Sequence, residues 1–270
     1  MTMFRSCRVL VFAAAALPLA LAGPAWAQDR DEEKPGWIVT VGGGAQVFPG
    51  YPGADGVDVF PLPILGLRRE GRPMAFEAPD QGWGFGLLGS DSPFDFGPAM
   101  QFQNKRRDRD VGAPVGEVGF TVEAGGFAQA FVTPNLRLRV EGRRGIGGHD
   151  GWVGDISADF VIRDDDNMIF SIGPRARIAD GGYHRAYFGV TPAAATATGL
   201  PEYRPGGGFY AIGASAGLTR RLSREWGIYA YAGYDRLIGD AADSPLVRTF
   251  GSRDQFSGGI GLFYEFTVRP

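Results

Sequence analysis

Few side chains in this sequence could serve as a catalytic base. The two histidines, His149 and His184, both fall in segments that we expect to be external loops, and His184 is expected to cap a strand end. His149 precedes Asp150, but adjacent residues of an extended segment point to opposite sides, so these two side chains make a poor catalytic pair. The sequence also lacks Gly-x-Ser-x-Gly, the motif that exposes a serine nucleophile in many hydrolases. We therefore expect a protein that is not an enzyme.

The sequence gives equally little indication of a metal-binding site. Two histidines supply too few ligands for a zinc site. Asp240 and Asp243 could contribute to a calcium site, but calcium takes about six to eight oxygen ligands, and an aspartate here also suits the start of a turn. Cys7 is the only cysteine and lies near the N-terminus, in a segment that we expect to be removed. We expect no metal and no cofactor.

A larger set of charged side chains occupies every second position in several extended segments. From Leu136 to Arg143, apolar residues alternate with arginine and glutamate, so that one face is apolar and the other charged. Similar alternation runs through residues 94–103, 117–124, 152–163 and 168–178. The charged set comprises Glu117, Glu123, Arg137, Arg139, Glu141, Arg143, Asp155, Asp159, Arg163, Arg175 and Arg177. Because enclosed charges must be paired or hydrated, this set predicts either an ion-pair network that braces a filled interior or the lining of a narrow polar conduit.

The segments that carry these charges have the properties of membrane-spanning strands. They are about ten residues or longer, as a tilted spanning strand must be. Many aromatic residues fall near the expected strand ends, where membrane barrels carry aromatic girdles. Glycine, at 43 of 270 residues, suits close strand packing and disfavours helices. A soluble sandwich would also alternate, but with an export signal the pattern predicts an all-β, transmembrane antiparallel up-and-down β-barrel.

The turns predict the number of strands. Short polar turns are expected at 69–71, 90–93, 133–135, 164–167 and 223–225, and longer connections at 49–56, 78–81, 104–115, 146–150, 179–206 and 240–253. Bacterial barrels alternate short periplasmic turns with long external loops. The alternation holds if Pro73–Ala78 and Gly82–Leu88 are separate short strands, which gives twelve strands, with ten as the alternative count.

The N-terminus predicts export and the domain boundaries. Arg5 and Arg8 precede an apolar run of 14 residues, 9–22, which is too short to span a membrane, and Ala25-Trp26-Ala27 is a cleavage site. We expect a signal peptide over 1–27 cleaved after Ala27, a periplasmic tail over 28–36, a barrel over 37–270 and location in the cell outer membrane. Residues 1–27 hold two of the 27 basic residues and none of the 30 acidic ones, so the remaining chain has a net charge of −5. That charge disfavours nucleic acid as a partner.

Three segments resemble the MipA/OmpV family of outer-membrane proteins. They are Gly42-Gly43-Gly44 continuing through Pro49–Gly53 to Phe60–Pro63, then Tyr187–Pro192 with Gly199–Tyr203, and finally Asp235–Val247. The resemblance extends from about Trp37 to Phe266, and the chain differs from the family pattern in continuing to Pro270. It implies an outer-membrane barrel without a catalytic motif, and we expect the protein to contact outer-membrane lipid and lipopolysaccharide.

The same resemblance implies a function in the cell envelope. We expect a non-enzymatic scaffold that links murein-remodelling enzymes, with a lytic transglycosylase and a penicillin-binding protein as partners. A narrow pore for small solutes is the alternative, since the charged set could line a conduit. The third hypothesis is a surface adhesin that acts through the loops 179–206 and 240–253.

Overall fold

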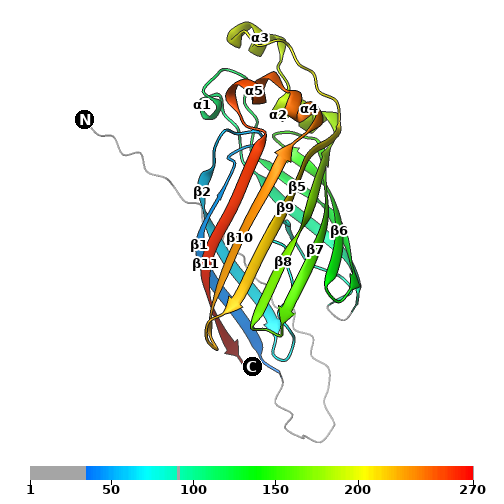
Figure 1. Ribbon diagram of the computed structural model, residues 1–270, viewed down its shortest axis with the longest axis vertical. Coiled ribbons are helices and arrows are strands. Elements are labelled where there is room, and N and C mark those ends of the chain that lie inside the picture. The colour runs from blue at the N-terminus through cyan, green and yellow to red at the C-terminus, as the bar shows by residue number, and fades with distance from the viewer. Residues whose placement is uncertain (1–34, 90–91, 270) are drawn as a thin grey trace, which may run out of the picture. The chain divides into compact units, whose positions relative to one another are not determined.

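A computed structural model describes residues 35–89 and 92–269. The expected signal peptide, its cleavage site after Ala27, most of the tail 28–36 and part of the expected turn 90–93 lie outside these residues. The described residues contain one curled antiparallel sheet of eleven strands (Figure 1). The strands are β1 (Trp37–Phe48), β2 (Asp58–Arg69), β3 (Trp83–Gly84), β4 (Phe94–Gln103), β5 (Thr121–Thr133), β6 (Leu136–Gly147), β7 (Trp152–Asp164), β8 (Met168–Ala179), β9 (Gly208–Arg221), β10 (Trp226–Leu237) and β11 (Asp254–Val268).

The sheet is an up-and-down barrel wall in which the first and last long strands meet. From β3 to β11 each strand pairs with its neighbour in sequence, and β11 then pairs with β1, with Trp37 opposite Val268. β2 pairs with β1 and completes the order β2-β1-β11-β10-β9-β8-β7-β6-β5-β4-β3. The predicted fold class, an all-β antiparallel barrel of the membrane type, is confirmed.

The two faces of the sheet differ in the way that the alternation predicts. On β6, Arg137 and Arg139 are buried inside the barrel, whereas Leu138 and Val140 are exposed on its outside. Exposed apolar side chains continue around the outer face of most long strands, including Val41, Leu65, Phe96, Val132, Ile156, Ile172, Ile212 and Ile260. An outward apolar band with an inward polar face is the pattern of a transmembrane barrel.

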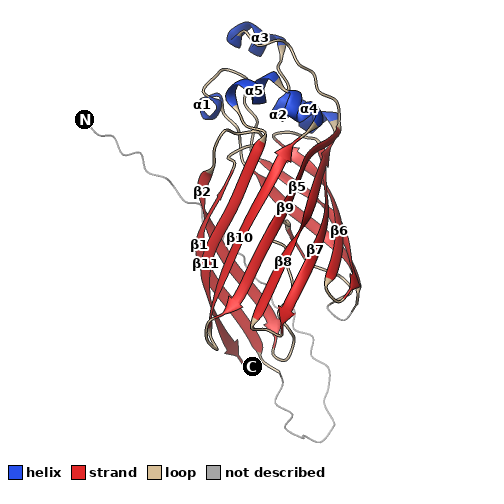
Figure 2. Cartoon of the chain, viewed as in Figure 1, coloured by secondary structure: helices blue, strands red, loops and turns tan. Residues whose placement is uncertain are grey.

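Five short helices cover one end of the sheet (Figure 2). They are α1 (Asp108–Val111), α2 (Gly181–Phe188), α3 (Pro192–Thr198), α4 (Gly239–Asp243) and α5 (Pro245–Phe250). We call α1, α2, α4, α5 and the loop 49–57 the cap, because their side chains share one buried core with the strand ends. None of the helices among the described residues is long and apolar enough to cross a membrane.

Helices in 179–206 and 240–253 were not expected, and local capping explains them. The Asp180 carboxylate accepts from the backbone N–H of Tyr183 at the start of α2. The Thr191 hydroxyl accepts from the backbone N–H of Ala194 at the start of α3, and Ser244 caps α5 in the same way. Side-chain caps therefore offset a glycine-rich composition that disfavours helices overall.

The expectation of strands at Pro73–Ala78 and Gly82–Leu88 is wrong for the first segment and mostly wrong for the second. Residues 73–82 form no strand, and only Trp83–Gly84 of the second segment pairs with β4. The twelve-strand count therefore becomes eleven among the described residues. Residues 73–82, which we call the inner segment, lie against side chains that line the interior of the barrel. β2 and β3 end the sheet order without pairing to each other.

Candidate functional site

The barrel interior holds a connected network of ion pairs. Nine of the eleven charged residues singled out in the sequence belong to it, namely Glu123, Arg137, Arg139, Glu141, Arg143, Asp155, Asp159, Arg175 and Arg177. They come from β5, β6, β7 and β8, which are neighbours in the sheet. Since inward side chains of adjacent antiparallel strands stand side by side, the two-residue period places opposite charges in contact.

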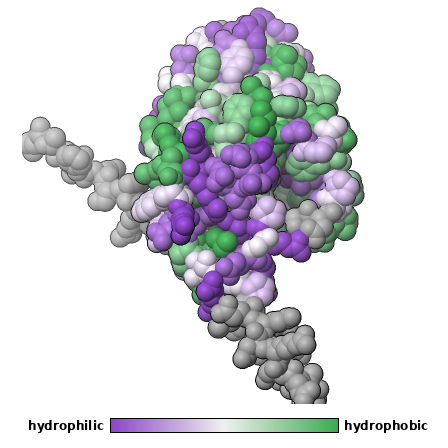
Figure 3. All heavy atoms as spheres, turned by 60° about the horizontal axis from the view of Figure 1, so that its bottom comes forward, coloured by the Kyte–Doolittle hydropathy of each residue, from purple (hydrophilic) through white to green (hydrophobic). Residues whose placement is uncertain are grey.

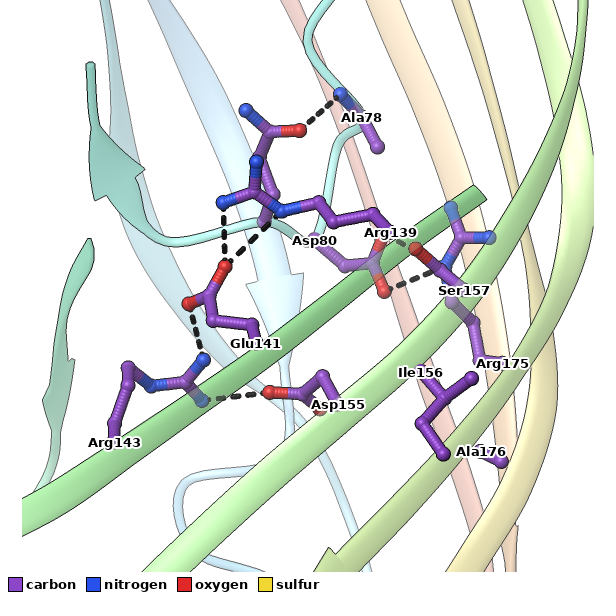
Figure 4. Close-up of a pocket in the computed structure, with 11 residues that line it drawn as sticks. Ala78, Asp80, Arg139, Glu141, Arg143, Asp155, Ile156, Ser157, Arg175 and Ala176 are labelled. Atoms are coloured by element: carbon purple, nitrogen blue, oxygen red, sulfur yellow. Dashed lines mark hydrogen bonds and ion pairs between the residues drawn. The ribbon is translucent and has the colours of Figure 1, made fainter. Parts of the chain in front are cut away.

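One branch of the network is centred on Arg143 (Figure 4). Its guanidinium contacts Glu123 at 2.9 Å and Asp155 at 2.7 Å, and it also pairs with Glu141. Glu141 in turn accepts from Arg139 at 2.6 Å. Arg139 also lies over the ring of Phe127, 3.7 Å from its centroid. This arginine therefore combines an ion pair with an aromatic contact.

The other branch passes through the inner segment. Asp80 contacts Arg175 at 2.8 Å and Arg177 at 3.2 Å. Arg175 continues to Asp159 at 2.7 Å, and Asp159 to Arg137, also at 2.7 Å. The two branches join because Arg177 also contacts Asp155 of β7, at 2.8 Å. Asp80 is thus the residue through which the inner segment is bound to the wall.

Further contacts hold the inner segment in place. The Gln81 side-chain oxygen accepts from Arg137 at 2.9 Å, and the same guanidinium lies 4.5 Å from the centroid of the Phe76 ring. Near the turn end, the backbone N–H of Met74 donates to Asp166 at 2.7 Å. The inner segment is therefore anchored at both its ends and near its middle.

Sequence reasoning missed Asp80 and also Asp235, which contacts Arg177 at 2.9 Å. Asp80 was expected in a connection between two strands. The signal that could have found it is Pro79-Asp80-Gln81, because a proline without an N–H followed by two polar residues does not continue a strand. Asp235 lies on β10, whose alternation was not analysed for charge.

The charged part of the interior is closely filled. Arg137 and Asp159 are both 0% exposed. The cavity bordered by Asp80, Arg139, Glu141, Arg143 and Arg175 measures only about 20 Å³, which is room for roughly one water molecule. Because an unpaired charge at such a position would cost several kcal/mol, the pairing is a condition for this interior to exist.

Two of the predicted charges lie outside this network. Glu117 is exposed in the segment before β5, which begins only at Thr121. Arg163 lies near the end of β7 and donates to the backbone oxygen of Met74 at 2.6 Å. The inward position expected for Glu117 was wrong because the alternation was extended past the start of β5, whereas Arg163 stays within β7 and lines a cavity at the turn end of the barrel.

A wider cavity opens at the end of the barrel opposite the helices. We call it the vestibule; it measures about 700 Å³. Figure 3 turns this end forward and shows hydrophilic residues gathered at its centre with hydrophobic ones around them. The charged residues that line it are Arg68, Arg72, Arg163, Arg221, Arg224, Asp165, Asp166, Glu225 and Glu265. Charged residues thus make up most of its lining.

At the opposite end, the cap covers the barrel with a buried core. Tyr187, Phe188, Leu246 and Val247 are each 0% exposed. Arg106, which is almost fully buried, donates to the backbone oxygen of Tyr187 at 2.8 Å. The Ser244 hydroxyl donates to the backbone oxygen of Phe188 at 2.7 Å, which joins α5 to α2. The cap is therefore a packed layer and not a set of separate loops.

Both histidines lie in or under this layer, and the expectation that they occupy external loops has to be refined. His149 is buried, with its Nε2 3.0 Å from Glu123 and its Nδ1 accepting from the backbone N–H of Gly151 at 3.1 Å. His184 lies in α2 and does not cap a strand; it is 1% exposed. Neither ring nitrogen of His184 has a well-formed hydrogen-bond partner in the described part of the chain. Burial lowers the pKa of His184, against the opposing pull of the Asp240 and Asp180 carboxylates.

Asp240 and Asp243, the residues considered for calcium, have other contacts in the structure. The Asp240 carboxylate accepts from the backbone N–H of Gly206 at 2.7 Å. Asp243 contacts Arg248 of α5 at 2.6 Å. Each carboxylate thus connects parts of the cap or its neighbouring loop.

Comparisons of the chain with solved structures found remote likenesses. Among solved structures it is similar to a KdgM porin, with 11% identity, a TM-score of 0.36 and coverage of 86% of this chain and 99% of that one. It is similar to a NanC porin at 11% identity, with a TM-score of 0.39 and coverage of 84% and 100%. The outer membrane protein OprG from Pseudomonas aeruginosa matches at 9% identity, with a TM-score of 0.26 and coverage of 87% and 98%. These remote likenesses carry no conclusion about function.

The comparison with curated proteins found no significant match. The comparison with family models found one that covers most of the chain. The family is described as MltA-interacting protein MipA, and its model matches residues 41–266.

Proposed function

The chain belongs to the MltA-interacting protein MipA family, and from this premise we propose that it is a non-conducting outer-membrane scaffold for murein-remodelling enzymes. The observation that carries the proposal is the filled charged part of the interior, where the ion-pair network and the inner segment leave a cavity of only about 20 Å³ beside β6, β7 and β8. We expect a barrel filled in this way to have a function other than the passage of solutes. It can serve as a fixed membrane platform with one accessible polar end.

The proposed orientation follows from the connections between strands. The turns after β5, β7 and β9 are short, whereas the helices lie in the connections at the other end. In bacterial barrels short turns face the periplasm. The vestibule would then face the compartment that contains murein and its enzymes, and the cap would face outward.

The vestibule has the chemistry of a docking surface for a polar partner. Arg224 is exposed on the turn between β9 and β10, at the rim of this cavity. Exposed arginines are favoured at interfaces because the planar guanidinium donates several hydrogen bonds at once. We propose a lytic transglycosylase as the partner on the strength of the family description, and a penicillin-binding protein as a second partner from the sequence resemblance.

Site-specific crosslinking in intact cells tests this function. A photo-crosslinking amino acid at Arg224 should capture a lytic transglycosylase or a penicillin-binding protein. The matched control carries the same crosslinker at Thr196, an exposed position on α3 at the opposite end. Capture at Arg224 of barrel-assembly proteins and lipopolysaccharide alone would contradict the scaffold.

The filled interior speaks against the narrow pore, which was the alternative. The surface-adhesin hypothesis stays a prediction about α3 and the neighbouring loop. An adhesin should lose surface binding when residues 191–205 are excised while the barrel keeps its heat-modifiable migration on a gel. Retention of full binding after this excision would contradict the adhesin hypothesis.

A further inference from the structure

The wall of the barrel has a seam between β2 and β3. These strands end the sheet order, so one edge of β2 has no strand beside it among the described residues. The backbone N–H of Glu70 donates to Gly36 of the chain before β1. The pairing of β1 with β2 has no register shift, so this one hydrogen bond fixes the direction of the backbone groups along β2. The even-numbered residues direct their backbone N–H and C=O groups at β1, and the odd-numbered residues direct theirs at the seam.

The seam edge of β2 carries two prolines. Pro61 and Pro63 are both odd-numbered, so the positions where their N–H groups would point at the seam have no donor. Prolines at a sheet edge prevent another strand from adding to it. In a membrane they also reduce the number of backbone donors left without a partner. The edge is therefore poorly suited to pair with another strand, and two fewer donors face the seam.

Behind the seam lies a cavity of about 480 Å³. Most of its lining residues are apolar, and we call it the apolar cavity, but Glu77, Gln81 and Thr219 also border it. β2 contributes Leu62 and Ile64, the inner segment Met74 and Ala75, and β11 the almost fully buried Phe263. Trp83 of β3 borders the cavity on the other side of the seam. A volume of this size lies in the range of roughly 300–1,000 Å³ that is usual for small-ligand sites.

The apolar cavity and the vestibule meet at two charged residues. Arg68 and Glu265 line both cavities. Arg68 contacts Asp166 at 3.3 Å and Glu265 at 3.4 Å, and its buried Nε has no hydrogen-bond partner among the described residues. The Nε of Arg221, which also lines the vestibule, is buried and without a partner as well. Both guanidinium groups also pair with Glu265, so each keeps only its buried Nε–H without a partner where the cavity reaches the polar end.

We propose that the seam admits one acyl chain of an anionic glycerophospholipid from the surrounding membrane. The acyl chain of the lipid occupies the apolar cavity, and the phosphate of its headgroup lies at Arg68 and Arg221 in the vestibule. A lipid is the occupant because the seam opens beside the lipid-facing surface, where Leu65 and Leu67 of the same strand are 68% and 65% exposed. The site is apolar at the seam and carries arginines at the turn end. This arrangement matches a lipid of the membrane leaflet on the side of the turn end. This site does not depend on the scaffold function.

Photo-crosslinking from the lipid tests the site. The mature protein is placed in nanodiscs of phosphatidylethanolamine and phosphatidylglycerol, in which the phosphatidylglycerol carries a diazirine in the middle of one acyl chain. After irradiation, adducts are mapped by mass spectrometry. We expect adducts on Phe263 or Tyr229, which line the cavity, as well as on the outward Leu65. Adducts confined to outward residues that do not line the cavity, such as Leu138 and Val140, would overturn the proposal.

A filled-cavity variant and a headgroup variant separate the two parts of the site. Ala75→Trp should remove the inward adducts and leave those on Leu65, and unchanged inward adducts would overturn the assignment of the cavity. Arg68→Gln should lower inward capture of phosphatidylglycerol severalfold. Its matched control is Arg69→Gln, since Arg69 is the next residue and stacks on Trp37 at 3.9 Å on the other face of the strand. Equal capture by these two variants would overturn the headgroup contact. Heat-modifiable migration verifies that each variant is folded.

Discussion

Asp159 shows how closely the interior depends on pairing. Its two carboxylate oxygens accept from different arginines, Arg137 and Arg175, and the side chain is 0% exposed. A carboxylate with two arginine partners is stabilised by both, whereas each arginine would be left with an uncompensated charge if the carboxylate were lost. The loss of stability on removing such a residue therefore comes mainly from the buried arginines that remain without a partner.

We predict that Asp159→Asn lowers the free energy of unfolding by about 3–5 kcal/mol, the usual cost of breaking a buried ion pair. Guanidinium unfolding of the protein in detergent micelles would measure the change. Arg236→Gln is the matched control, because its ion pair with Asp254 is half exposed, and it should have a far smaller effect. Equal losses in the two variants would show that burial of the network contributes nothing.

His184 makes the cap sensitive to acid. Because burial lowers its pKa below the ordinary value of 6.5, the packed cap binds a proton on this ring less tightly than an open cap does. The contribution of the neutral ring to cap stability is complete above pH 6.5 and is lost as the pH falls below that value. We predict faster amide hydrogen exchange in α2 at pH 5 than at pH 7.5, after correction for intrinsic rates.

The variant His184→Phe keeps an aromatic ring in contact with Phe188 and Tyr210 but cannot be protonated. Its corrected exchange in α2 should depend much less on pH. An unchanged acid response in this variant would assign the effect to another group and contradict the prediction.

Among the elements, β2 combines features of a membrane strand and of a protected sheet edge. Its outward residues Val59, Leu65 and Leu67 are exposed and apolar, and Pro61 and Pro63 stand between them. Long, unprotected edges tend to pair with other chains, so prolines at this position favour a monomeric barrel.

We predict that the double variant Pro61→Val, Pro63→Val self-associates, because it restores two backbone donors on the open edge. Sedimentation velocity in detergent should show a dimer that the native protein lacks at the same concentration. Leu65→Ala alters the same edge without adding a donor and should remain monomeric. A monomeric double variant would mean that the edge is protected by something other than its prolines.

For the molecule as a whole, the combination of a packed cap and a bound inner segment predicts a closed barrel. The native protein should show no steady conductance in planar bilayers. Asp80→Asn weakens the contacts to Arg175 and Arg177 and should produce open events several-fold more often. Glu70→Gln, the same change of acid to amide at a turn outside the network, should behave like the native protein. Steady conductance of the native protein would contradict the filled interior and support the narrow pore.

The period of two between Leu136 and Arg143 predicted a strand with one apolar and one charged face, because a strand allows only two faces. Together with the expected export signal it predicted the fold class and which residues face inward. The cap and the inner segment could not be predicted in this way. Asp180, Thr191 and Ser244 start helices through contacts that span only a few residues within long connections. The inward course of residues 73–82 depends on Asp80 meeting arginines about 95 positions later in the chain, and periodicity contains no information on such distant pairs.

The pairing of β1 with β11 has a consequence for the order of assembly. The β1–β2 hairpin is local and can form early, but its ladder with β11 has to wait for the last residues of the chain. The inner segment continues directly from the β2 turn, and the arginines that pair with its Asp80 lie on β8. Joining β1 to β11 therefore encloses the inner segment, so the Asp80 contacts have to form before or during this last step. A chain that joined its ends with residues 73–82 still outside would be a kinetic trap, a complete wall around an interior of unpaired arginines.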